Sequence, residues 1–243
     1  MLLPTAFALS FIANVAQAGD QSPGAVVAGV NAYNRGDFNA AYALLRQEAD
    51  RGNSDAEVNL GYLYARGQGV APNQAEAFHL YDLSAQQGNG EGMNALGYKY
   101  QFGTGIKPDI PQAIRWYCAA LHRGNPRAMN NLALMLDTGK DVPRDLAAAR
   151  DLWQQSIDHG DVNGMYNLGL SLLRYPSQPD DKQVGTRWIV EAANRGQIGA
   201  QQLLRQNGYR GALPAVIDFS GQMRLQPRDA PPGHADICGS LIS

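Results

Sequence analysis

A glycine returns every 36 residues along most of this chain. The five positions are Gly52, Gly88, Gly124, Gly160 and Gly196. In each case Arg, Gln or His precedes the glycine, and Asn, Asp or Gln follows it. A glycine just past a helix can adopt the left-handed conformation that ends the helix, and Asn or Asp can cap the next one. The period therefore indicates a repeat protein with one such helix boundary in each unit.

Each unit is predicted to contain two amphipathic helices. The first carries a leucine at the same place in every unit, at Leu60, Leu96, Leu132 and Leu168. Tyr or Leu follows four residues later, which marks one helix face, and the small residue between them leaves room for a second helix. The second helix alternates small and bulky residues, as at Ala113, Trp116 and Ala120. Neither helix can bury its apolar face alone, so we expect neighbouring units to stack into an all-α fold, an α-solenoid.

The positions that recur from repeat to repeat, which we call columns, also predict the organisation of the chain. Residues 19–208 form the solenoid, preceded by a signal peptide at 1–18 and followed by an irregular C-terminal tail at 209–243. The repeats are expected at about 53–88, 89–124, 125–160 and 161–196. An opening helix pair at 25–51 and a closing helix at 197–206 flank them. The tail is expected to cover the bare face of the last repeat with its apolar segment 213–219, the alternative being an arm that contacts a partner.

The first residues resemble an export signal. An apolar run from Leu2 to Val15 ends in Ala16-Gln17-Ala18, the small-x-small pattern of a cleavage site. The run is too short for a membrane span. No Lys or Arg precedes it, although export signals usually begin with a positive charge. A misassigned start at Met1 would explain why this charge is missing. The alternative is an N-terminal core helix. We expect a periplasmic protein whose mature form has no integral membrane segment.

Charge and motifs exclude several functions. The net charge is −2 and the pI about 6.1, so we expect no nucleic-acid partner and no strong attachment to anionic membranes. The glycines Gly67 and Gly69 follow a helix, lack a G-K-[ST] ending and recur 36 residues later, which favours a corner over a phosphate loop. No histidine stands in a metal motif, and no nucleophile, base and orienting residue group together. The prediction is a non-enzyme without cofactor or metal.

The aligned columns resemble the Sel1-like repeat family, a relative of the tetratricopeptide repeat. The resemblance is carried by L-G-x-x-Y at 60–64 and 96–100, G-x-G-[VI] at 67–70 and 103–106, A-x-x-x-Y at 77–81 and A-x-x-W-Y at 113–117. Repeats three and four depart from the pattern, since Asp141 stands where Gly105 stands in repeat two, and residues 173–177 replace the corner of repeat four.

This resemblance implies a protein-binding adaptor. Exported bacterial members of the family act as envelope regulators, assembly factors and immunity proteins that neutralise antibacterial effectors, secreted lipases among them. The expected partner is therefore another protein, in the sharpest form a secreted toxin such as a phospholipase. An envelope regulatory or assembly adaptor is the alternative, and an enzyme or a binder of peptidoglycan or another cell-wall ligand is a lesser one.

If the first helix of each repeat packs as in related repeats, its side opposite the second helix lines a concave groove. The predicted groove residues are Asn59, Tyr62, Arg66, Asn94, Tyr98, Arg127, Asn130, Asn131, Tyr166, Asn167 and Arg174. An Asn amide can both donate to and accept from a peptide backbone, and Tyr supplies contact area with a polar end. Glu91 and Asp137 would add charge selectivity. Alternatively, the asparagines bond only locally within their helices.

The two cysteines are Cys118 and Cys238. Cys118 occupies a column otherwise filled by Asp82, Gln154 and Val190, so its side chain is expected to be exposed and available to the tail. An even pair in an exported protein can form one bridge. The prediction is a Cys118–Cys238 disulfide, with two free thiols as the alternative.

Overall fold

The computed structural model describes residues 23–207 and 237–242, and all regular structure in these residues is α-helical. The chain forms two compact units, 1–107 and 108–243. The first contains α1 (Pro23–Asn34), α2 (Phe38–Ala49), α3 (Ser54–Arg66), α4 (Gln74–Gln86) and α5 (Gly90–Phe102). The second contains α6 (Ile110–His122), α7 (Pro126–Thr138), α8 (Leu146–Asp158), α9 (Val162–Arg174), α10 (Asp181–Asn194), α11 (Ile198–Gln206) and α12 (Ile237–Ile242).

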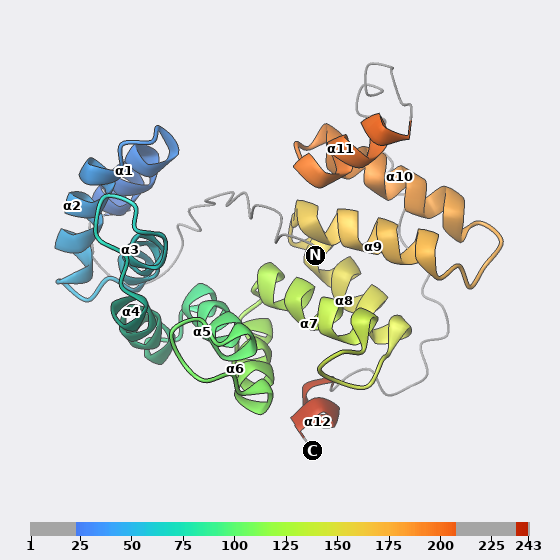
Figure 1. The fold of residues 1–243 in the computed structure, drawn as a ribbon, viewed down its shortest axis with the longest axis horizontal. Helices are drawn as coiled ribbons and strands as arrows, with labels where there is room; N and C mark the ends of the chain where they lie inside the picture. Colours follow the sequence, from blue (N-terminus) through green and yellow to red (C-terminus); the bar gives the residue numbers. More distant parts are fainter. Residues whose placement is uncertain (1–22, 208–236, 243) are drawn as a thin grey trace. The chain divides into compact units, whose positions relative to one another are not determined.

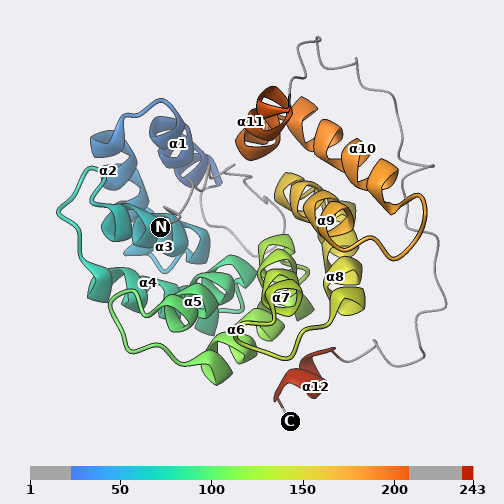
Figure 2. The ribbon, with the colours of Figure 1, turned by 45° about the vertical axis from the view of Figure 1, so that its right-hand side comes forward.

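Consecutive helices pack side by side in chain order, from α1 to α5 in the first unit and from α6 to α11 in the second (Figure 1 and Figure 2). The pairs α3–α4, α7–α8 and α9–α10 form the helical hairpins of the repeats, and α4–α5 and α8–α9 join one hairpin to the next. This is the arrangement of an α-solenoid, so the predicted fold class is confirmed. No helix in the described parts of the chain has the length and apolar character that crossing a membrane requires.

The periodic glycines end helices as predicted. Gly52, Gly88 and Gly196 have φ angles of 79°, 87° and 88°, in the left-handed region. The next residue caps the following helix: the Asn53 side chain accepts from the backbone N–H groups of Asp55 and Ala56 at 3.0 and 3.1 Å. Each R-G-N type triplet therefore closes one helix and opens the next.

The G-x-G corner is held by close backbone packing. Gly69 has a φ of 71°, and a Cβ atom at this position would lie 2.2 Å from the backbone oxygen of Phe38. Both the left-handed conformation and the missing side chain are therefore required where the corner contacts the start of α2. This geometry supports the interpretation of G-x-G as a corner, since the glycine faces protein backbone.

The corner of repeat four is held by charged side chains instead. Arg150 on α8 and Asp181 on α10 are both buried, with Nη1 and Oδ2 3.6 Å apart. Asp181 Oδ2 accepts from the backbone N–H of Ser177 at 2.6 Å and of Gln178 at 3.0 Å, and Arg150 Nη2 donates to the carbonyl oxygen of Tyr175 at 2.5 Å. A buried ion pair thus organises the segment in which the glycine motif is missing.

Small residues let the paired helices approach closely. A Cβ atom at Gly61 would lie 2.5 Å from Tyr81 Cε1, and one at Gly169 would lie 2.7 Å from Ile189 Cγ1. The role predicted for the small residue beside each column leucine is therefore confirmed at these two positions. The column leucines are fully buried, together with the large side chains Tyr81, Tyr117, Trp153 and Ile189.

The end of the chain returns to the second repeat. Cys238 on α12 is joined to Cys118 on α6 by a disulfide, with the two Cα atoms 5.7 Å apart. The expected exposure of Cys118 is wrong: its side chain is 3% exposed. The reason is that α12 packs on α6, whereas the corresponding Asp82 and Gln154 remain half-exposed.

Two sequence predictions fall outside the described residues. They are the signal peptide at 1–18 and the capping of the last repeat by 213–219. The described part of the tail, α12, packs against α6.

Candidate functional site

The predicted groove positions differ in burial. At the position two residues before each column leucine, Asn94 and Asn130 are buried, with exposed fractions of 6% and 9%. Tyr166, at the corresponding place in repeat four, is half-buried. The prediction that Asn94 and Asn130 line an accessible groove is therefore corrected, because this column turns toward the neighbouring helices. The positions two residues after each leucine are more accessible, and Leu134 is 43% exposed.

Asn130 belongs to a hydrogen-bond network that joins three helices. Its Oδ1 accepts from Trp153 Nε1 on α8 at 3.0 Å and from Asn167 Nδ2 on α9 at 2.8 Å. A buried indole N–H needs an acceptor, and Asn130 supplies it. Two of the predicted groove asparagines, Asn130 and Asn167, thus bond to each other across a repeat boundary.

The remaining asparagines are held differently. Asn59 donates through Nδ2 to the carbonyl oxygen of Asp55 at 2.8 Å, one turn earlier in α3. The local bonding that the sequence left open is therefore present at Asn59. Asn131 is half-buried on α7.

In the first unit, Tyr62 and Arg66 are tied to neighbouring helices. The Tyr62 hydroxyl donates to Glu91 Oε1 on α5 at 2.6 Å, and the ring centroids of Tyr62 and Tyr81 lie 5.4 Å apart. Arg66 Nη1 donates to the Tyr33 hydroxyl on α1 at 3.2 Å. These contacts position polar groups at the surface of α3 and α5 and leave Arg66 exposed.

An aromatic pair, the half-buried Tyr98 and the exposed Phe102, lies toward the C-terminal end of α5. The rings of Tyr98 and Phe102 are 4.5 Å apart between centroids, and Phe102 is 51% exposed. We call Tyr98 and Phe102 the aromatic pair. Sequence reasoning missed Phe102, although its signal was present: it stands four residues after Tyr98 and therefore on the same helix face. The equivalent positions hold Arg66, Thr138 and Arg174.

In the second unit, the predicted residues are more widely dispersed. Arg127 is half-buried, and Arg174 is exposed near the ring of Tyr175, 5.8 Å from its centroid. Tyr166 packs on α11, where a Cβ atom at Gly199 would lie 3.3 Å from its ring, and burial raises the pKa of the Tyr166 hydroxyl.

Asp137 does not contribute a surface charge. It is buried, and its Oδ1 accepts from Ser171 Oγ on α9 at 2.7 Å. The predicted role of Asp137 in charge selectivity is corrected accordingly, because its carboxylate is used inside the helix packing. Glu91, which received the same prediction, is half-exposed and accepts from Tyr62.

Glu57 and Lys99 are two of the buried ionisable residues of the first unit. Burial raises the pKa of the Glu57 carboxyl to about 7, and Gln87 Nε2 donates to Glu57 Oε2 at 2.8 Å. Burial also lowers the pKa of Lys99, whose ammonium donates to Gln74 Oε1. Within the described residues, no three or more His, Cys, Asp and Glu side chains are grouped so as to hold a metal ion.

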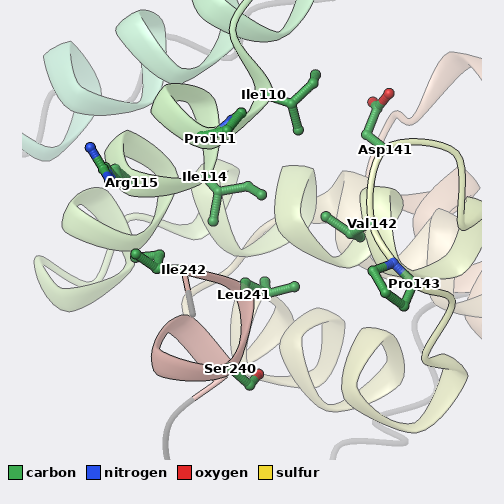
Figure 3. Close-up of a pocket in the computed structure, with 10 residues that line it drawn as sticks. All are labelled: Ile110, Pro111, Ile114, Arg115, Asp141, Val142, Pro143, Ser240, Leu241 and Ile242. Carbon is green, nitrogen blue, oxygen red and sulfur yellow. The ribbon is translucent and has the colours of Figure 1, made fainter.

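A cavity of about 360 Å³ lies in the second unit, away from the predicted groove residues. It is bounded by α6, the corner between α7 and α8, and α12 (Figure 3). Its apolar walls come from Ile110, Ile114, Val142, Leu241 and Ile242.

Comparison with known proteins identifies the repeat. Residues 54–89, 90–125 and 126–161 each match the Sel1 repeat. No curated protein matches the chain. The structure of a Sel1 repeat protein from Oxalobacter formigenes is similar over 75% of this chain and 72% of that one, with 24% identity and a TM-score of 0.60.

Two further solved structures share the fold. One is c5321, a protective antigen of uropathogenic Escherichia coli, with 26% identity, a TM-score of 0.55 and coverage of 77% of this chain. The match covers only 41% of c5321. The other is the immunity protein Pa5087 of Pseudomonas aeruginosa, with 18% identity, a TM-score of 0.57 and coverage of 88% of this chain and 80% of that one.

Proposed function

Because the chain belongs to the Sel1-repeat family, we propose that it is a non-enzymatic scaffold that binds another protein through the accessible side of its first helices. The aromatic pair carries this proposal. Tyr98 and Phe102 form a contiguous aromatic surface at the end of α5, and Phe102 is half-exposed where most large apolar side chains of the repeats are buried. Aromatic side chains dominate the binding energy of protein interfaces because they bury large areas at low entropic cost.

The polar side chains of the first unit that were predicted for the groove favour binding over catalysis. Tyr62 donates to Glu91 and Arg66 donates to Tyr33, so each polar end is held by a contact between helices. Polar groups held in this way are typical of the border of a protein interface. Catalysis instead needs a nucleophile, a base and an orienting group around one reacting position, and these contacts provide none.

We infer that the partner is a secreted antibacterial effector, such as a phospholipase, which this protein holds inactive. The support is the known use of exported Sel1-like proteins as immunity proteins, together with the shared fold of Pa5087 over most of this chain. Cells that lack the protein should lose viability when a neighbouring cell delivers the effector, and producing the protein should restore growth. An envelope regulatory or assembly adaptor would instead form a complex with a resident envelope protein and give no protection.

The binding surface can be tested directly by isothermal titration calorimetry with the purified effector. Replacing the aromatic pair, Y98A/F102A, should weaken binding by about 30-fold or more, since one hot-spot residue contributes about 2 kcal/mol or more. The matched control is His79→Ala, an exposed side chain on α4. Unchanged affinity of Y98A/F102A, with a wild-type circular dichroism spectrum, would contradict the surface assignment.

We also propose that the protein is exported to the periplasm after cleavage behind Ala18. The Cys118–Cys238 disulfide supports this location, because disulfides persist in oxidising compartments. Mass spectrometry of the protein isolated from periplasm should give a mature N-terminus at Gly19. An uncleaved N-terminus on protein found in the cytoplasm would refute the export proposal.

A further inference from the structure

The C-terminal helix α12 is joined to α6 by the Cys118–Cys238 disulfide and packs on that helix. Cys238 is the buried residue of α12, while Leu241 is half-buried and Ile242 is 46% exposed. In the close-up, Leu241 and Ile242 lie next to the cavity, on the side opposite Val142 and Ile110 (Figure 3). The segment therefore forms one wall of this cavity.

The docking of α12 depends strongly on the disulfide. A helix of six residues is far too short to be stable alone, because helix nucleation is unfavourable. The two cysteines are 120 residues apart in the sequence. Without the bond, so short a helix would have to be held on α6 by its non-covalent contacts, among them those of Leu241 and Ile242 beside the cavity.

The surface next to α12 contains buried apolar side chains, with Arg115 and Asp141 also lining the cavity (Figure 3). Ile114 and Val142 are 4% and 8% exposed with α12 in place, and Cys118 lies one turn of α6 after Ile114. Removal of α12 would expose this strip together with the Cys118 thiol. A contiguous apolar strip of this kind is suited to bind an apolar segment.

We propose that the Cys118–Cys238 disulfide is a redox latch: reduction by a dithiol releases α12 from α6 and uncovers the apolar strip formed by Ile110, Ile114 and Val142. In its closed state the strip is occupied by α12 of the same chain. The latch is separate from the aromatic pair on α5, so it does not depend on the function proposed for that surface.

The chemistry is a thiol–disulfide exchange. A thiolate of the dithiol attacks Cys238 Sγ, whose neighbours Gly239 and Ser240 are exposed, and the Cys118 sulfur leaves with the bonding electron pair and takes up a proton. The second thiol of the reductant then displaces Cys238 from the mixed disulfide and closes the reductant's own disulfide. Two electrons pass to the protein, and two thiols replace one disulfide.

Hydrogen–deuterium exchange of the full chain tests the latch, comparing oxidised protein, dithiothreitol-reduced protein and the Cys238→Ser variant. In the latter two, amides of 237–242 should exchange at least about tenfold faster, because local protection reflects the free energy of opening. Peptides from the first turns of α6 should become more exposed to solvent, while those of α9 and α10 should keep their rates.

The variant L241A/I242A, kept oxidised, is the matched control that removes the apolar contacts but retains the bond. It should keep residues 237–242 more protected than the reduced protein does, because the covalent link still holds Cys238 against α6. The proposal is overturned if α12 keeps its protection after full reduction. It is also overturned if the native protein resists reduction, or if reduction accelerates exchange equally throughout the second unit.

Discussion

Removal of the Arg150 guanidinium should destabilise the second unit strongly. Arg150 and Asp181 are buried on α8 and α10, and their side chains hold the corner at 175–178. In R150M the apolar stem is approximately preserved, so the main change is the loss of a cation. The Asp181 carboxylate would then stay buried without its counter-charge, and the Tyr175 carbonyl would lose its donor.

The size of the effect follows from the burial of both partners. Breaking one half of a buried ion pair costs about 3–5 kcal/mol, because the remaining charge is left uncompensated. Asp181 keeps its hydrogen bonds from the backbone of Ser177 and Gln178, which places the expected loss toward the lower end, about 3 kcal/mol. Adding Asp181→Asn should recover part of the loss, since a neutral amide is cheaper to bury than an unpaired carboxylate.

Tryptophan fluorescence during urea unfolding isolates the relevant unit. The three tryptophans, Trp116, Trp153 and Trp188, all lie in the second unit, so their signal reports this unit even if the two units unfold separately. Far-UV circular dichroism reports both. The control is Lys182→Met, an exposed lysine on the same helix as Asp181, which should change the free energy of unfolding by less than about 0.5 kcal/mol.

Two results would refute the reasoning. One is an R150M protein within about 1 kcal/mol of wild type, which would mean that the buried charge needs no partner. The other is a double variant R150M/D181N that is less stable than R150M alone, since this would show that the carboxylate itself, and not its pairing, stabilises the corner.

Three further outcomes follow from the fold. Gly69→Ala should lower the unfolding temperature of the first unit clearly more than Gly36→Ala in thermal circular dichroism, because both glycines have positive φ but only Gly69 faces a backbone oxygen. Burial raises the pKa of Glu57 from its ordinary value of 4.5 to about 7, so the folded state keeps the proton of this carboxyl between these two pH values. The stability that this group contributes is therefore lost as the pH rises through that range. Urea unfolding at a series of pH values should show this decrease in the free energy of unfolding in wild type and not in E57Q. Non-reducing mass spectrometry should find one cross-linked peptide joining Cys118 to Cys238, and two alkylatable thiols in protein from an oxidising compartment would contradict it.

The helical fold was predictable from the sequence because it is determined by local residue patterns that recur with a fixed period. The triplet around Gly52 specifies a helix end and a cap within three residues, and the structure shows both. The corner of repeat four has no such local signal, because Arg150 and Asp181 act together there over 31 positions of sequence. Pairings at such separations leave no periodic trace in a single sequence.

The candidate site was predictable only in part, for a related reason. A helix face can be read from spacing, but the depth of each position depends on how closely the neighbouring helices approach. Asn130 was expected at the surface, but it is buried and its Oδ1 accepts a hydrogen bond from the indole N–H of Trp153. Phe102 was overlooked because the equivalent positions hold Arg66, Thr138 and Arg174, so the repeat gives no aromatic signal there. Its exposure of 51% depends on the packing at the end of α5.

The central proposal is that the first-helix side of the repeats binds a protein, and photo-crosslinking in the producing cells tests it most directly. A photoreactive amino acid at position 102, beside Tyr98, should trap one protein in a defined complex. The same amino acid at position 86, an exposed place on α4, should trap none. Equal crosslinking from both positions, or none from position 102 while position 86 captures a partner, would contradict the account.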